Sequence, residues 1–223
     1  MQDILKNYYA AGGKTLFQPR ENIVEQQLDT IYAKCELEHI VDGVSKGDFL
    51  FKQEPGKPVL LVGKVTGLTP GPHGFHIHEF GDLSDGCASA GGHYNPDGVD
   101  HGDLDSGHAG DLGNITADEQ GVANISMVLK RVDLQGDRNV VGRAIVIHAE
   151  EDDLGKGGDE ESTKTGNAGD RLGCGVIRLA TLEESVQLDE GVILNTALIV
   201  GALTSMLAQV PDVNPEKNDL QAV

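Results

Sequence analysis

The sequence has few of the residues on which several classes of protein depend. Its 223 residues include 3 cysteines and no tryptophan, and aromatic residues make up 4%. Three cysteines are too few for a secreted domain held together by disulfides. Residues 1–30 carry charges throughout and contain no apolar run of the signal-peptide kind. We therefore expect a cytoplasmic protein.

Positive charge is scarce as well. Lysine and arginine together number 17, against 36 aspartates and glutamates, and the formal net charge is -19. Such a chain is repelled by the phosphates of nucleic acids and by anionic lipid surfaces. Nucleic-acid binding and docking to an anionic membrane surface are excluded on this ground.

Glycine, in contrast, is abundant, with 30 residues. Short alternating or apolar segments are separated by Gly, Pro and Asp, which predicts an all-β sandwich or barrel. The expected strands lie within residues 32–38, 48–51, 59–65, 74–80, 113–117, 123–129, 142–149 and 174–179. Two long segments poor in apolar residues, 81–112 and 150–170, interrupt these strands. Loops of that length in a compact domain are usually functional.

Six of the 8 histidines lie in or beside the long segments. His76 and His78 alternate along one expected strand, so both imidazoles leave the same face, as a copper or zinc site requires. A His-x-His pair alone is weak evidence, because such pairs also occur on surfaces. His148 ends a later strand and offers a third copper ligand, and a shared His93 would supply the fourth nitrogen.

The segment 81–112 holds three imidazoles and a carboxylate, a closed tetrahedral set suited to zinc. These residues are His93, His101, His108 and Asp111. A solvated His-rich loop and metal-free packing of neutral histidines are the alternatives. The His-x-x-Asp pair stands where the next strand begins, which favours metal binding because its ligands then rest on a rigid element.

Five longer motifs, in the family's order, resemble the eukaryotic Cu/Zn superoxide dismutases. They are GPHGFHIHEFG at 71–81, GGHYNP at 91–96, GDLGNITA at 110–117, DDLGKGG at 152–158 and GNAGDRLGCGVI at 166–177. The resemblance covers residues 31–180. It implies an eight-stranded Greek-key β-barrel or sandwich with long metal-binding and electrostatic loops.

The resemblance also implies one copper ion and one zinc ion per subunit. The copper ligands would be His76, His78, His93 and His148. The zinc ligands would be His93, His101, His108 and Asp111, with His93 the bridge. Asp152 matches a carboxylate that links a copper-ligand histidine to a zinc-ligand histidine, giving their outer N–H groups an acceptor.

Further roles follow from the same resemblance. Arg171 would hold superoxide beside copper through paired donors. A charged rim would guide the anion, formed by Lys164, Thr165, Glu160 and Glu161. Cys87 and Cys174 match an intrasubunit disulfide, with two reduced thiols as the alternative expected in the cytosol. Cys35 matches a small buried residue of the first strand.

The function implied is disproportionation of superoxide to O₂ and H₂O₂ by Cu(II)/Cu(I) cycling, with His93 as proton carrier. Family members usually form homodimers, and a copper chaperone is the expected partner in maturation. A chaperone with a dismutase-like domain is an alternative function, but the sequence has no Cys-x-x-Cys motif. A metal store without turnover is another. His101 and His108 are closer together than is usual in the family, so zinc is expected to bind with altered affinity.

Residues 1–30 and 181–223 lie outside the resemblance and are interpreted as extensions of a dismutase domain at 31–180. Residues 192–210 are mostly apolar and predict a helix. We favour a helix packed against the barrel, a partner subunit or the N-terminal extension, since polar residues interrupt the stretch and acidic residues flank it. A membrane-spanning tail anchor and an extension without a role are the alternatives.

Overall fold

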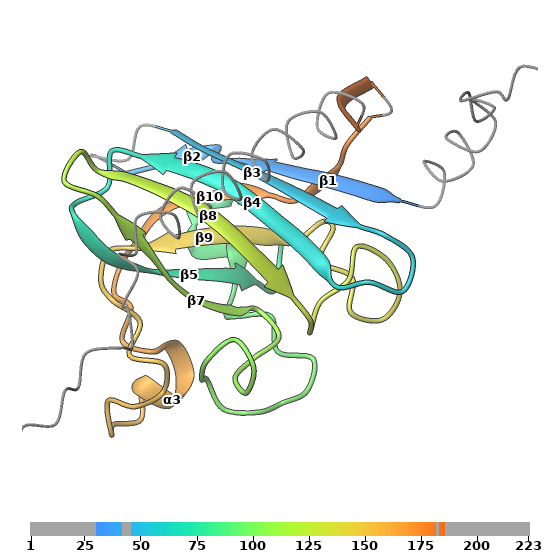
Figure 1. The fold of residues 1–223 in the computed structure, drawn as a ribbon. Helices are drawn as coiled ribbons and strands as arrows, with labels where there is room; N and C mark the ends of the chain where they lie inside the picture. The colour runs from blue at the N-terminus through green and yellow to red at the C-terminus, as the bar shows by residue number, and fades with distance from the viewer. Residues whose placement is uncertain (1–29, 42–45, 182, 186–223) are drawn as a thin grey trace, which may run out of the picture. The chain divides into compact units, whose positions relative to one another are not determined.

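The computed structural model describes residues 30–41, 46–181 and 183–185 (Figure 1). Residues 1–29 and the predicted helix at 192–210 lie outside the described residues. The chain divides into two units at residue 179, and the fold below belongs to the first. Among the described residues, no helix has the length and apolar character needed to cross a membrane.

The described elements are almost all strands, which confirms the all-β prediction. They are β1 (Ile31–Glu36), β2 (His39–Ile40), β3 (Lys46–Gln53), β4 (Val59–Thr66), β5 (Gly71–His78), β6 (Ser84–Cys87), η1 (Ala88–Ala90), β7 (Asp111–Ala117), β8 (Val122–Leu129), β9 (Ala144–His148), α3 (Ser162–Thr165), β10 (Arg171–Val176) and β11 (Arg178–Leu179).

Two five-stranded sheets face each other, with the orders β11-β1-β3-β4-β8 and β2-β10-β9-β5-β7. All named pairs of strands are antiparallel. At one edge of each sheet lies a strand of 2 residues, β11 or β2, and the four other strands of each sheet are the eight that the resemblance implies. After β5 and β7 in the second sheet, the chain returns as β8 beside β4 in the first, a Greek-key connection.

The core lies between the sheets and follows from the alternation of apolar residues. In β3, Phe49 and Phe51 point inward, and the Phe49 ring stacks on that of Phe75 in β5 with 5.4 Å between centroids. Cys35 in β1 is buried among the core residues, and this burial raises the pKa of its thiol. Cys35 is therefore a small core residue, as predicted, and not a reactive nucleophile.

β5 is buried on both of its faces from His73 to His78. Phe75 and Ile77 face the core, whereas His76 and His78 leave the opposite face and are covered by the two long connections. Figure 1 shows the later part of the first connection, up to residue 110, and the α3 region of the second below β5 and β7, on the side away from β3 and β4. A two-sided burial of this kind places polar side chains in a dry environment.

The structure differs from the sequence prediction in more than shifts of a few residues at the strand ends. The expected strand 174–179 divides at Ile177, whose N–H bonds to Arg143 O. Before that point β10 belongs to one sheet, and after it β11 pairs with β1 of the other. The segments 81–112 and 150–170 contain β6, η1 and α3, which are too short for a periodic pattern to reveal.

Candidate metal centre

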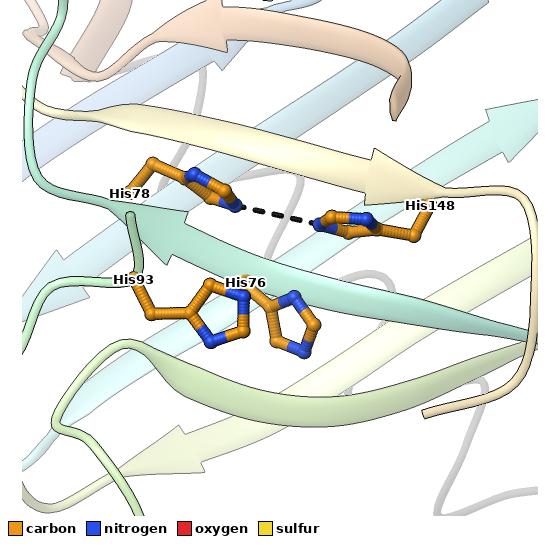
Figure 2. A group of neighbouring side chains, drawn as sticks. All are labelled: His76, His78, His93 and His148. Atoms are coloured by element: carbon orange, nitrogen blue, oxygen red, sulfur yellow. Dashed lines mark hydrogen bonds between the residues drawn. The ribbon is translucent and has the colours of Figure 1, made fainter. Parts of the chain in front are cut away.

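Four buried imidazoles gather on the outer face of the β5–β9 sheet (Figure 2). His76 and His78 come from β5, His148 from the end of β9, and His93 from the connection that pairs with His78 in an isolated bridge. Ligand atoms of the four residues all lie within 4.8 Å of one another. Strand alternation on β5 thus brings together the predicted pair, and antiparallel pairing with β9 adds the third.

For His78 and His148, the hydrogen bond at Nδ1 determines which ring nitrogen carries the proton. His78 Nδ1 lies 3.0 Å from Gly91 O and His148 Nδ1 lies 3.1 Å from Gly169 O. A carbonyl oxygen only accepts, so both Nδ1 atoms donate and both Nε2 atoms carry lone pairs. These two Nε2 atoms face each other at 3.4 Å. Two facing lone pairs repel unless a cation lies between them.

His76 completes this argument. Its Nε2 lies 2.9 Å from Asp152 Oδ2, whereas its Nδ1 is buried and has no hydrogen-bond partner among the described residues. An orphaned buried nitrogen is costly in a folded protein. The three nitrogens left with lone pairs are a donor set that suits a copper or zinc ion. The residues present therefore fit a resident metal ion.

A second group surrounds the carboxylate of Asp111 at the start of β7. His93 Nδ1 and His108 Nδ1 lie 2.8 and 3.1 Å from its Oδ1, and His101 Nδ1 lies 2.9 Å from its Oδ2. Like Nδ1 of His76, His101 Nδ1 is buried and has no hydrogen-bond partner of good geometry among the described residues. Three imidazoles and one carboxylate oxygen form the ligand set of a closed zinc site.

Asp152 joins the two groups. Its Oδ2 accepts from His76 and its Oδ1 lies 2.8 Å from His101 Nε2. Asn114 of β7 holds the Asp152 backbone through two hydrogen bonds of 2.8 Å. Gly166 packs against the carboxylate with φ 69°, and a Cβ there would collide with both Asp152 and His101. The linking role that the resemblance assigns to Asp152 fits this arrangement.

Burial keeps most of the imidazoles neutral, as metal ligation requires. It lowers the pKa of His76 to about 3 and that of His148 to about 4, and it also lowers the pKa of His78 and His93. Burial acts in the same direction on His101, but its partners Asp111 and Asp152 outweigh it and raise that pKa to about 9.

An open pocket of about 450 Å³ leads to the first group of histidines. Arg171 lies on its wall, and its two Nη atoms donate to Cys87 O at 2.6 Å and to Gly91 O at 2.7 Å. A guanidinium has five N–H donors, so donors remain for an anion. Of the predicted rim, Glu161, Lys164 and Thr165 line the pocket. Glu160 does not, but its carboxylate pairs with Lys164 at 2.6 Å.

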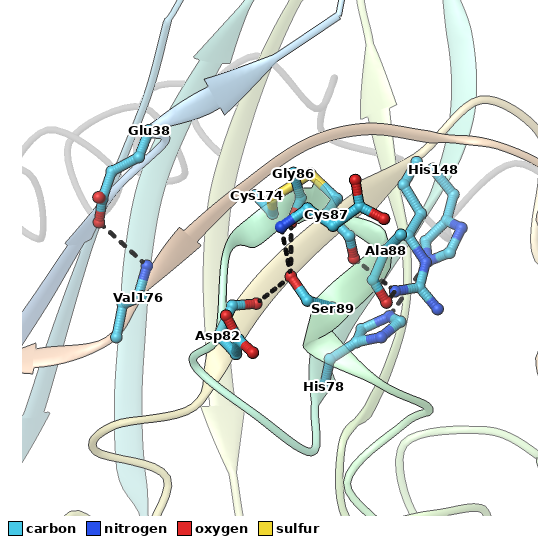
Figure 3. Close-up of a disulfide and its surroundings, with 12 residues drawn as sticks. Glu38, His78, Asp82, Gly86, Cys87, Ala88, Ser89, His148, Cys174 and Val176 are labelled. Carbon is cyan, nitrogen blue, oxygen red and sulfur yellow. Dashed lines mark hydrogen bonds between the residues drawn. A yellow bond between two sulfur atoms is a disulfide. The ribbon is translucent and has the colours of Figure 1, made fainter.

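A disulfide between Cys87 and Cys174 fastens the end of β6 to β10 (Figure 3). The predicted pairing is confirmed, and the alternative of two reduced thiols is not what the structure contains. Around it, Ser89 Oγ lies 2.9 Å from Asp82 O and 3.2 Å from Gly86 O, either of which can accept its proton, and this contact shapes the turn before η1. The disulfide thereby fixes the carbonyl of Cys87 to which Arg171 donates.

Sequence reasoning missed the partners that orient the imidazoles. The carbonyls of Gly91 and Gly169 carry no side-chain signature, so no motif could have assigned them this role. Asn114 lies inside the motif at 110–117, but the motif did not reveal that this residue holds Asp152. His73, which lies in the motif at 71–81 but in neither ligand group, bonds to His148 O and Thr69 O at 2.8 and 2.9 Å.

Two buried groups that share His93, on a Greek-key sandwich of antiparallel sheets, are each able to hold a metal ion. Residues 45–177 match the family model described as copper/zinc superoxide dismutase, and the chain belongs to that family. It is accordingly an enzyme, an oxidoreductase that acts on superoxide. The resemblance seen in the sequence is confirmed.

An Asp152→Asn variant tests the link between the groups. The amide keeps the shape of the carboxylate but has one acceptor oxygen, so either His76 or His101 loses its acceptor. We expect metal affinity to fall by about 10–100-fold, the usual effect of losing such a partner. Competition with a chromophoric chelator measures it. Glu151→Gln, an exposed neighbour, is the control, and unchanged affinity in Asp152→Asn would contradict the linking role.

Proposed function

We propose that the chain disproportionates superoxide with one copper ion and one zinc ion per subunit. The copper ligands are His76, His78, His93 and His148, and the zinc ligands are His93, His101, His108 and Asp111. The observation that carries this proposal is that His93 belongs to both buried groups. An imidazole without its proton offers a lone pair at each ring nitrogen and so serves two cations.

Bound copper supplies one-electron exchange with superoxide, while zinc keeps a single oxidation state. Two superoxide anions and two protons give one O₂ and one H₂O₂. The chain must deliver protons, and His93 suits this task because its Nδ1 lies within the Asp111 group, 2.8 Å from Asp111 Oδ1, which leaves its Nε2 for proton exchange. Its Nε2 takes up a proton in one half of the cycle and gives it to the product in the other. The pocket beside His93 provides access to solvent.

Anion capture must be local, because the chain carries a net charge of -19. Exposed charges farther than about 8–10 Å are screened at cellular ionic strength. Arg171 and Lys164 line the same pocket and supply positive charge within it. The Lys164–Glu160 pair is exposed, which orients the lysine without burying it. We assign the guidance of superoxide to Arg171 and to this rim.

An Arg171→Gln variant is expected to lower kcat/KM for superoxide by about tenfold or more. Hydrogen bonds to charged groups contribute about 1.5–3 kcal/mol, and this variant removes such a donor from the anion's path. Pulse radiolysis at several ionic strengths measures the loss. The loss should shrink at high ionic strength, because salt screens the attraction between superoxide and Arg171 in the wild type. Arg171→Lys should recover part of the rate. Lys64→Gln, an exposed change on β4, should have no effect, and an Arg171→Gln rate equal to wild type would refute the assignment.

Metal analysis beside a superoxide assay on the purified protein tests the proposal as a whole. We expect dismutation that follows copper occupancy. A fully loaded protein without turnover would indicate a metal store, and copper transfer to an acceptor without turnover would indicate a chaperone. The homodimer, the maturation chaperone and the cytoplasmic location stay predictions, and light scattering on the purified protein tests the first.

A further inference from the structure

The turn between His101 and His108 is held mainly by one side chain. Asp103 Oδ1 accepts from Asp105 N at 3.1 Å, and from Ser106 N and Oγ at 2.9 and 2.7 Å. The N–H of Gly107 returns to Asp103 O at 2.9 Å. These bonds fix the shape of the turn. They lie within the turn itself, so they do not fix its position against the sheets.

Arg131, in the connection between β8 and β9, supplies an external contact to the main chain of the turn. Its Nη1 donates to Gly107 O and lies 3.5 Å from His108 O. Its Nη2 donates to Asp97 Oδ2 at 3.1 Å, in the stretch between His93 and His101. One guanidinium therefore reaches the segment that bears the ligands at two separate places.

The Arg131 guanidinium is itself held in place. Both Nη atoms of Arg138 donate hydrogen bonds to the Asp97 carboxylate, at 2.6 and 3.1 Å. Its Nη1 also donates to Arg131 O at 3.1 Å. Hydrogen bonding to Arg138, with Arg131 assisting, keeps the pKa of Asp97 below its usual range, so the carboxylate stays charged. Asp97, Arg131 and Arg138 form a bidentate network, the kind of surface ion pairing that does contribute.

His108 is the ligand that most needs such support. Asp152 anchors the outer nitrogen of His101, but among the described residues the hydrogen bonds of the His108 ring involve Nδ1 alone. Its ring orientation depends on its backbone. That backbone is fixed by the His108 N–H to Asp111 Oδ2 at 2.7 Å and by the contacts of Arg131.

We propose that Arg131 is a positioning residue for the zinc-ligand group, which acts through the main chain at Gly107 and His108. Asp97 and Arg138 hold its guanidinium in place. The inference rests on the zinc assignment made above. A residue that sets the orientation of the His108 imidazole therefore lies in the β8–β9 connection, outside the segment that carries the ligands.

Cobalt(II) is the probe for the test, because its visible absorption reports the geometry of a tetrahedral site. Protein stripped of metal is titrated with Co²⁺ against a chelator. We expect Arg131→Ala to bind Co²⁺ about tenfold more weakly, the size of effect seen for outer partners of ligands, with a weaker and shifted band. Arg131→Lys should recover part of both. Lys130→Ala removes the neighbouring exposed charge, which lies 3.6 Å from Asp105, and should change neither.

Ionic strength gives a second readout. Asp97 and Arg131 are about a quarter exposed, so salt screens their pairing. Co²⁺ release should therefore accelerate with salt in the wild type and respond less in Arg131→Ala. Equal affinity and spectra in Arg131→Ala and wild type would overturn the proposal, and so would equal losses in Arg131→Ala and Lys130→Ala.

The zinc assignment has its own signature. A wild-type protein that shows no tetrahedral Co²⁺ band would refute the assignment, and the role of Arg131 with it. A normal wild-type band with no change in Arg131→Ala would refute the role of Arg131 alone. Should Arg131→Ala not fold, Asp97→Asn removes the charge that fixes the guanidinium and is expected to weaken Co²⁺ binding in the same direction.

Discussion

Replacing His76 with alanine is expected to abolish both copper binding and dismutation. His76 supplies the orphaned Nδ1 of the first group and, through its Nε2, one of the two imidazole partners of Asp152. Loss of a residue that only hydrogen-bonds to a metal ligand lowers metal affinity by about 10–100-fold. His76 is itself a proposed ligand, so its loss should lower copper affinity by more than about 100-fold. Dismutation should fall to the uncatalysed rate.

Copper stoichiometry by elemental analysis and superoxide decay by pulse radiolysis measure the two effects. His39→Ala is the matched control, because His39 is an exposed histidine of β2 outside both ligand groups. Near-ultraviolet circular dichroism establishes that both variants fold. A His76→Ala protein that keeps its copper and its rate would refute the ligand assignment.

Removing the disulfide should cause the largest loss of stability. Cys87 and Cys174 are 87 residues apart, and the loop-entropy model gives about 3–5 kcal/mol for a cross-link of that span. Cys174 is fully buried beside Ala144 and Val146, so alanine is the suitable replacement. The free energy of unfolding of the Cys87→Ala/Cys174→Ala variant, measured in urea on metal-free protein, should fall by this amount.

Cys35→Ala separates loss of the cross-link from loss of a sulfur atom. Cys35 is equally buried but unpaired, and its removal should cost about 1 kcal/mol, the value of one buried methylene-sized group. The double variant should also lose activity, since the carbonyl of Cys87 holds Arg171. Equal stabilities for the double variant and Cys35→Ala would show that the cross-link contributes nothing.

Local pattern and motif order accounted for most of the ligand set before the fold was seen. The alternation of His76 and His78 is a property of any strand, so it could be predicted from two residues. The union of His93 with His148 depends on the β5–β9 pairing, so the residues alone could suggest it only as a hypothesis, which the family motifs then supported. Each predicted ligand lies in one of the two groups.

What escaped prediction depends on tertiary structure. The carbonyls that orient His78 and His148 become acceptors only when the connections close over β5. Arg131 lies in a connection with no motif, and its reach to Gly107 follows from how β8 ends. The division of the last expected strand at Ile177 was hidden as well, because an apolar run does not show where a chain changes sheets.

The carboxylate of Asp152 has a thermodynamic consequence. Each of its oxygens orients one imidazole, so an ion that immobilises either ring also removes conformational freedom from the other through the shared anchor. On the copper and zinc assignment proposed above, the second ion would lose less entropy on binding, which is cooperativity without a change of shape. Such coupling is reciprocal: the factor by which zinc improves the affinity for copper equals the factor by which copper improves the affinity for zinc.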